Sequence, residues 1–367
     1  MEFERLVTAA EAACREGRQR EAEWLAVAAL AIADERAPTR PERQARAALV
    51  LAEVRISLGG FTEAEALSRR ALRALDAHGA AGETGAARLR VRALCALGSA
   101  LRGQGRYRDA EEPLRDALVL AERSFGSDDL AVVGAANDLA VLYKYMGRFD
   151  EAEMLYRHAL RVVEIRRGND ALEAATLWHN LGGLEHSRGR HALAEPAARR
   201  AVEIRTRALG ADHPAVAADA AALAAILDAL GRTDEAEALL RQALDIFTEL
   251  LGPRHYEVAI NANNLAALRY RVGDYDQAQA LWEQALDIKR EFLGETHPEV
   301  ATTMVNLGVL AATRGDDERG RSLFAEALRL LGPDVDPDHP VRRAATASLA
   351  KLNSRRRDDA WTRDDHD

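Results

Sequence analysis

The chain has 367 residues, a formal net charge of −9 and a sequence pI near 5.7. Hydrophobic residues make up 48% of the chain but aromatic residues only 5%, and Ala and Leu predominate, which favours close-packed helices over strands. The acidic balance argues against a general nucleic-acid-binding protein, because neutralising phosphates requires a basic surface.

The N-terminus, the cysteines and the lack of linkers set further limits. The first residues, MEFERLV, contain no apolar signal segment, and the longest apolar run, 25–33, is too short to span a membrane. Cys14 and Cys95 lie too far apart in the repeat pattern described below to predict a disulfide. No Gly/Ser-rich or Pro-rich linker divides the chain. We therefore expect one continuous all-α body, cytoplasmic and without membrane contact.

A fourteen-residue pattern, GRFDEAEMLYRHAL at 147–160, recurs along the chain. Successive copies are 42 residues apart except in one case, and this spacing predicts eight copies of one structural unit. The exceptional spacing is four residues longer, and its extra residues fall in the Gly-rich segment 78–85, where an insertion into a surface loop costs little. The reference glycines that open the copies are Gly17, Gly59, Gly105, Gly147, Gly189, Gly231, Gly273 and Gly315.

Each unit is predicted to be two helices joined by a short glycine turn. Small residues stand five and twelve positions after each reference glycine, as at Ala152 and Ala159. Seven residues are two helical turns, so both small residues lie on one face of a second helix and allow another helix to approach closely. A Leu or equivalent eight positions before the glycine, as at Leu139, belongs to an apolar-periodic first helix.

The joints between units carry their own signals. His-Pro pairs occur at 213–214, 297–298 and 339–340, and proline suits the first turn of a helix. We predict that these histidines are turn residues rather than metal ligands, because no Cys or carboxylate stands at metal-ligand spacing from them. In five copies a second glycine stands where a left-handed residue would end the second helix: Gly126, Gly168, Gly210, Gly252 and Gly294.

The C-terminal part departs from the pattern. Copy eight has Gly320 in place of the usual alanine, and its second helix is expected to end early, at 331–332. Residues 341–353 keep the register of a ninth first helix and are predicted to cap the stack of repeats. The tail, 354–367, carries charges of both signs and is predicted to be disordered, with Trp361 either idle or an anchor for a partner.

This pattern resembles tetratricopeptide repeats, specifically the 42-residue variety found in kinesin light chains and in many bacterial proteins. The resemblance is carried by LA-x-LY-x-x-x-GRFDEAE-x-LY-x-x-AL at 139–160 and by LG-x-x-HP-x-VA joints at 209–217 and 293–301. It covers residues 1–353 and implies a right-handed superhelical solenoid of about eight helix pairs with a C-terminal capping helix. The first helices would line its concave groove. In copies one, five, six and eight the usual aromatic after the glycine is absent, which predicts looser packing there.

The groove positions of the first helices hold the candidate ligand-binding residues. In the resembled family, asparagines directly before the signature Leu hold the main chain of a bound peptide, and a side-chain amide supplies both a donor and an acceptor. Asn180, Asn264 and Asn306 match this place, whereas Ala222 interrupts the series. The alternative is that these asparagines bond only to neighbouring helices. The full predicted set is Asn137, Lys144, Tyr145, His179, Asn180, His186, Asn263, Asn264, Tyr270, Arg271 and Asn306.

Basic residues at groove positions suggest the chemistry of the ligand. Arg92, Arg102, Lys144 and Arg271 lie there within an acidic chain, which favours an extended acidic-aromatic segment of a partner protein. Asp138 and Asp228 are expected to face the same way, and they weaken this argument.

No motif for catalysis or for a cofactor is present. The sequence has no phosphate-binding loop, nucleophile elbow, HExxH or CxxC pair. His179 and His186 lie seven residues apart on one helix face, but no third metal ligand stands near them. The favoured function is therefore a non-catalytic adaptor without metal or cofactor. The alternatives are a structural protein that self-associates into a homo-oligomer through its ends or convex face, and a regulatory or sensor subunit of a separately encoded enzyme.

Overall fold

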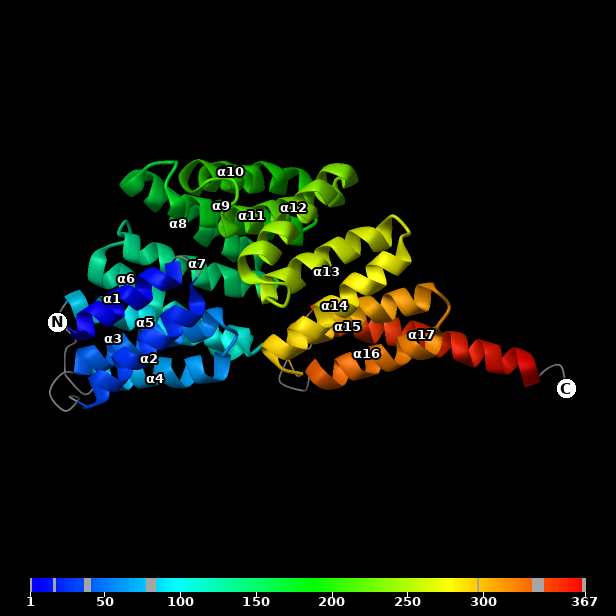
Figure 1. Ribbon diagram of the computed structural model, residues 1–367, viewed down its shortest axis with the longest axis horizontal. Coiled ribbons are helices and arrows are strands. Elements are labelled where there is room, and N and C mark those ends of the chain that lie inside the picture. Colours follow the sequence, from blue (N-terminus) through cyan, green and yellow to red (C-terminus); the bar gives the residue numbers. More distant parts are fainter. Residues whose placement is uncertain are drawn as a thin grey trace. The chain divides into compact units, whose positions relative to one another are not determined.

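The computed structural model describes residues 2–15, 18–35, 41–76, 84–295, 297–331 and 340–364. Regular structure in these residues is entirely helical, and the helices pack as sequential pairs with one extra helix at the end (Figure 1). The predicted all-α solenoid of about eight helix pairs is thereby confirmed. The helices are α1 (Glu2–Arg15), α2 (Gln19–Glu35), α3 (Pro41–Ser57), α4 (Phe61–Asp76), α5 (Thr84–Gly103), α6 (Tyr107–Phe125), α7 (Leu130–Tyr145), α8 (Phe149–Arg167), α9 (Leu172–Ser187), α10 (His191–Leu209), α11 (Pro214–Ala229), α12 (Thr233–Leu251), α13 (Tyr256–Arg271), α14 (Tyr275–Leu293), α15 (Pro298–Thr313), α16 (Asp317–Leu331) and α17 (Pro340–Asp364).

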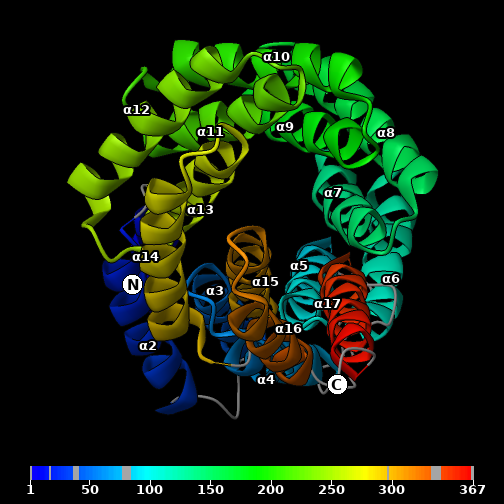
Figure 2. The same ribbon diagram turned by 90° about the vertical axis from the view of Figure 1, so that its right-hand side faces the viewer.

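The chain forms two compact units, Met1–Leu177 and Trp178–Asp367. In the first unit the first helices α1, α3, α5 and α7 pack on one another in series, and in the second unit α11, α13, α15 and α17 do the same. Figure 2 shows α12 and α14 on the outer side of the second unit, with α11 and α13 on its inner side. Each unit therefore presents a layer of adjoining first helices. The right-handed superhelix stays a prediction.

The turn between the two helices of a pair requires glycine. At Gly147 φ is +76°, a value that residues with a side chain rarely adopt. The backbone N–H of Arg148 donates to the Tyr143 carbonyl at 2.8 Å, and that of Gly147 donates to the Lys144 carbonyl at 3.1 Å. These two bonds form a Schellman motif that satisfies carbonyls at the end of α7. Gly17, the first reference glycine, lies outside the described residues.

The joints between pairs combine a glycine and a histidine. Gly126 ends α6 with φ +89° and ψ +155°. The predicted stop at glycine is therefore correct but its predicted left-handed helical conformation is wrong, because ψ is extended in a region open almost only to glycine. His213 and His297 are N-caps whose Nδ1 atoms accept from backbone N–H groups two residues on, at 3.1 and 3.2 Å, which confirms them as turn residues. His339 and residues 77–83 of the Gly-rich insertion lie outside the described residues.

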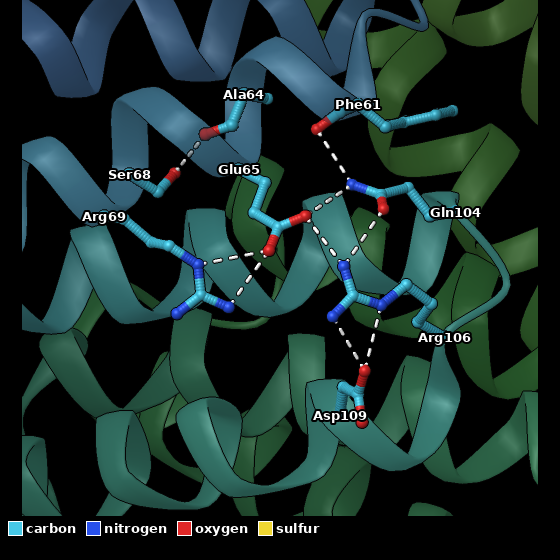
Figure 3. A network of polar contacts seen from close by, with 8 residues as sticks. All are labelled: Phe61, Ala64, Glu65, Ser68, Arg69, Gln104, Arg106 and Asp109. Carbon is cyan, nitrogen blue, oxygen red and sulfur yellow. Dashed lines mark hydrogen bonds and ion pairs between the residues drawn. The ribbon is translucent and has the colours of Figure 1, made fainter.

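Consecutive pairs are also joined by a polar network at their turns. Figure 3 shows the Arg106 guanidinium and the Gln104 amide donating to the Glu65 carboxylate of the preceding pair, at 2.9 and 3.0 Å. Burial raises the pKa of Glu65, but the hydrogen bonds from Gln104 and Arg69 and the charge of Arg106 outweigh it and leave the pKa below its ordinary value. The same bridge recurs one and three repeats later as Arg148–Glu111 and Arg232–Glu195, at 2.7 and 2.6 Å.

The last helix closes the second unit. Ala345 and Leu352 of α17 are buried against α15 and α16, as expected of a capping ninth first helix. A Cβ added at Gly320 would meet the Leu352 Cδ1 at 3.0 Å, so this departure from alanine allows a close approach. The helix continues past the expected end at residue 353 to Asp364, and residues 354–364 differ from the predicted disordered tail. They contain no Gly or Pro to stop a helix. The side chain of Trp361 lies outside those described.

Candidate functional site

A cavity of about 520 Å³ opens on the first helices of the first unit. Its walls come from α3, α5 and α7, and small side chains such as Ala96, Ala131 and Ala135 leave the space that bulkier residues would fill. The lining residues are Glu53, Ile56, Arg88, Val91, Arg92, Cys95, Ala96, Ser99, Leu130, Ala131, Gly134, Ala135 and Asp138. The cavity is mainly apolar, with a few charged groups, which is the usual character of a ligand pocket.

Asp138 supplies an unusual charge in this cavity. The Asn137 Nδ2 donates to its Oδ1 at 3.3 Å, and the Cys95 thiol on α5 donates to the same carboxylate. Burial raises the pKa of Asp138 to about 6, although the charge of Arg102 acts in the opposite direction. No basic side chain of the described residues forms an ion pair with Asp138. The cavity therefore contains a carboxyl group that changes charge near neutral pH.

A second cavity of about 410 Å³ adjoins the first and shares Glu53 and Arg92 with it. Arg92 donates from Nε and Nη2 to the two Glu53 oxygens at 3.2 and 2.8 Å, and from Nη1 to Glu11 at 3.5 Å. Burial raises the pKa of Glu53 even beside this guanidinium. We call the two cavities together the unit-1 groove; it crosses α1, α3, α5 and α7. Its second cavity is lined by Glu11, Cys14, Val50, Glu53, Val54 and Arg92.

Aromatic and basic side chains stand at the C-terminal ends of α5 and α7. The Tyr145 ring is 47% exposed and stacks on Tyr107 with ring centroids 5.7 Å apart. The Arg102 guanidinium lies over the Tyr145 ring, 5.5 Å from its centroid. Burial lowers the pKa of Lys144. Neither Arg102 nor Lys144 has an acidic partner within ion-pair distance in the described part of the chain, so both could bind an added carboxylate.

In the second unit several predicted binding residues are engaged within the fold. The His179 Nδ1 lies 2.7 Å from the Oδ1 of Asp219, a fully buried carboxylate that also pairs with Arg205. The His186 and His191 rings meet through their Nδ1 atoms at 3.1 Å. Asn180 is half-buried on α9 between these two sites. His179 and His186 are thus held by separate partners and do not converge on one point.

The asparagines of α13 and α15 divide into two kinds. The Asn306 Nδ2 donates to the Asn263 Oδ1 at 3.3 Å, which joins neighbouring first helices. This bond agrees with the alternative in which these amides bond within the solenoid. Asn264, by contrast, is half-buried and makes no hydrogen bond with any described residue. The predicted asparagine series is therefore only partly open to a ligand.

Two further predicted residues pack at the ends of α13 and α15. The Tyr270 hydroxyl lies 2.7 Å from the Thr313 Oγ1, and its ring contacts Trp282 with centroids 5.8 Å apart. Arg271 forms an ion pair with Asp228 of the preceding first helix. Burial lowers the pKa of Arg271. Its charge is therefore already matched within the fold.

The sequence prediction missed Glu53, Cys95 and Gly134 as cavity residues. Glu53 and Cys95 stand two positions after and two before the signature Leu of copies two and three, which are groove positions. Applying the same register to the early, more divergent copies would have found them. Gly134 carried no such signal, because its role is to leave space on α7.

The described residues contain no cluster of metal ligands and no membrane-spanning helix. No three His, Cys, Asp or Glu side chains among them converge as metal ligands would. Within the same part of the chain, every helix is too short or too polar to cross a bilayer.

Comparisons with known proteins follow the repeat register. A family model described as "Tetratricopeptide repeat" matches residues 89–165, 173–249 and 257–332, and a second model with this description matches 137–208. A search of curated proteins gave no match. The crystal structure of BtubC (BKLC) from P. vanneervenii is 27% identical over 62% of this chain and 89% of its own, with a TM-score of 0.46.

Two further solved structures are similar in fold alone. The apo form of RapI is 13% identical, covers 79% of this chain and 98% of its own, and has a TM-score of 0.57. A Rap protein complexed with competence and sporulation factor is 14% identical, covers 96% of this chain and 98% of its own, and has a TM-score of 0.61.

Proposed function

Because the chain belongs to the tetratricopeptide repeat family, whose members mediate protein–protein interactions, we propose that it is a non-catalytic module that binds an extended segment of a partner protein. The observation that carries this proposal is the unit-1 groove, a pair of adjoining cavities along four consecutive first helices. A groove of this length suits an extended peptide better than a compact small molecule, because successive side chains can enter successive cavities.

The chemistry of the groove indicates what the segment carries. An apolar or aromatic side chain fits the 520 Å³ cavity, whose walls are largely aliphatic. A neighbouring carboxylate of the ligand would reach Arg102 and Lys144, which form no ion pair with an acidic side chain in the described part of the chain. Arg92 and Arg271 contribute less, since Glu53 and Asp228 already pair with them. The segment is therefore aromatic and acidic.

The second unit offers amides of its own to an extended peptide. The side-chain amide of Asn264 on the first-helix layer forms no hydrogen bond with a described residue, and an extended peptide backbone offers both the donor and the acceptor that it needs. Asn180 occupies the same place in the register two repeats earlier. The Asn306 amide bonds to Asn263 and would have to exchange that partner to reach a ligand.

Selection from a phage-displayed library of random peptides, with the full chain as bait, tests this function. A Gly134→Phe variant fills the 520 Å³ cavity, since a Cβ at Gly134 meets no other atom within 4 Å. The matched control is Met154→Phe, which changes a residue on α8 that is 72% exposed and does not line the groove. Enriched peptides should bind the control as they bind the unmodified chain, and bind Gly134→Phe at least about tenfold more weakly.

The ligand chemistry is tested on the same peptides. Acidic-aromatic sequences should predominate among them, and their affinity should fall with added salt and in an Arg102→Ala, Lys144→Ala double variant. If no peptide is enriched, or if enriched peptides bind Gly134→Phe normally, the groove is not the binding site. If the enriched peptides contain no acidic residues but bind Gly134→Phe weakly, the groove is the binding site and its proposed preference for acidic segments is wrong.

A further inference from the structure

The outward face of α2 is apolar, unlike that of every other second helix. α2 packs on α1 and α3 through Ala22, Leu25, Ala26, Ala29 and Ala33. On its opposite face Trp24 is 68% exposed and Val27 46% exposed, with Ala28 and Ala31 beside them. These four residues stand at spacings of three, four and seven, so they form one continuous stripe.

The repeat register shows that this stripe is not a property of the fold. Three of the four equivalent positions on α4 hold arginines, Arg69, Arg70 and Arg73. On α14 three of them hold Glu283, Gln284 and Asp287, and no second helix other than α2 has apolar residues at all four. A solvated outer face is thus the rule in this chain, and an exposed apolar stripe marks a contact with another protein surface.

Unmatched charges lie at the two ends of the stripe. Arg20 precedes it by one turn and Glu35 follows it by one turn, and both side chains are exposed. Other charges of α2 are taken, since Glu23 pairs with Arg55 and Asp34 with Arg70. Neither Arg20 nor Glu35 forms an ion pair with a described residue. The face is therefore positive at its N-terminal end and negative at its C-terminal end.

Two copies of this α2 face are complementary in shape and charge when the helices run antiparallel. The positions are symmetric about the point between Val27 and Ala28, with Trp24 mirrored by Ala31 and Arg20 by Glu35. A two-fold axis at this point would place each Trp24 ring over the small Ala31 of a second copy, which permits close helix packing. It would also bring Arg20 of each copy to Glu35 of the other. A parallel arrangement would instead bring like charges together.

We propose that the chain forms a homodimer in which α2 packs antiparallel against α2 of a second copy. Trp24 is the central anchor, because a large aromatic side chain buried in an interface contributes most of the binding free energy. The contact uses the outer face of a second helix, so it leaves the unit-1 groove on the first helices open. The dimer and the proposed ligand binding are thus independent of each other.

Sedimentation velocity of the full chain over a range of concentrations tests the dimer. One helix pair is at the small end of interface sizes, so the series should run from about 1 to about 200 µM. A Trp24→Glu variant should raise the dimer dissociation constant at least about tenfold. The control is Met154→Glu, which adds the same charge at the same register position of α8 and should leave the dissociation constant unchanged.

Charge exchange tests the antiparallel arrangement. Arg20→Glu and Glu35→Arg should each weaken dimerisation, because each sets like charges opposite one another. A mixture of the two single variants should dimerise as the unmodified chain does, since both ion pairs are then restored between unlike copies. An unmodified chain that stays monomeric throughout the series overturns the proposal. A mixture no stronger than the single variants overturns the antiparallel contact.

Discussion

The ionised carboxylate of Asp138 destabilises the folded protein, because the side chain is buried in the cavity. Burial raises its pKa to about 6 from an ordinary 3.8, so the folded state favours the protonated form. The stability that the protonated Asp138 contributes is therefore fully present below pH 3.8 and is lost as the pH rises through 6. An Asp138→Asn variant should be more stable than the unmodified chain at pH 8, by about 1–2 kcal/mol, and not at pH 4.

Thermal unfolding at the two pH values measures this difference. The amide keeps an oxygen that can accept from the Cys95 thiol, so the hydrogen bond survives the substitution. Asp128→Asn, at an exposed position before α7, is the control and should show no such gain. A loss of stability at pH 8 would show that the charge of Asp138 is compensated in the folded protein.

His255 is a residue whose protonation should weaken a helix. Its Nδ1 accepts from the Glu257 N–H at 3.2 Å and caps α13, which requires the unprotonated nitrogen. Burial lowers the pKa of His255 below 6.5, so its stabilising effect is present above that pH and is lost as the pH falls through the lowered value. His255→Ala should cost about 1 kcal/mol at pH 8 and less at pH 5, measured by urea unfolding. His255→Asn, which can cap at either pH, should remove this pH dependence.

At the scale of the helix, glycine has opposite effects at two positions. A Cβ at Gly98 of α5 would lie 2.3 Å from the Cγ of the buried Leu114 on α6. Gly98→Ala should therefore destabilise the chain by about 1–3 kcal/mol through overpacking. Gly134 of α7 has open space at its Cβ position, and Gly134→Ala should stabilise by about 0.5–1 kcal/mol through helix propensity alone. Equal shifts in the two denaturation midpoints would contradict this close approach of α5 and α6.

The contrast between turns and groove shows which features a sequence predicts. The turn at Gly147 needs a positive φ, and that need selects a single residue type that recurs with the repeat. The Asn306–Asn263 bond and the Cys95–Asp138 contact join different repeats, so they depend on the distance between helices. Asp138 lines the 520 Å³ cavity, as its register position on a first helix predicts, whereas the placement of Asn306 in a groove stays a prediction. The repeat register could not show that Asp138 and Asn306 already have hydrogen-bond partners on neighbouring first helices.

The ψ of Gly126 and the length of α17 were missed for related reasons. Glycine is allowed in two regions of positive φ, and the sequence does not say which of them the joint uses. The charged segment 354–364 has the composition of a disordered tail but contains no residue that stops a helix. Composition favoured disorder, and the absence of a stop allowed the helix to continue.

For the whole molecule, stability is expected to be local, because the main helix contacts of the described residues join helices of the same pair or of adjoining pairs. The final helix α17 contacts α15 and α16, and its Leu352 is 2% exposed in a core that includes Phe324. A Leu352→Asp variant buries an unpaired charge there and should release α17 from the second unit. Hydrogen exchange should then accelerate in α15 and α16, whereas α3 to α6 in the first unit should be unchanged.

The control for this experiment is Ser354→Asp, which adds the same charge two residues on at an exposed position and should not alter exchange in either unit. Uniform acceleration across both units in Leu352→Asp would mean that the chain unfolds as one cooperative body. Restriction to α15, α16 and α17 would mean that the first unit, with its groove and its α2 face, keeps its structure when the C-terminal end opens. Ligand binding in the unit-1 groove and pairing through α2 should therefore both survive this substitution, because the residues of that groove and of the α2 face all belong to the first unit.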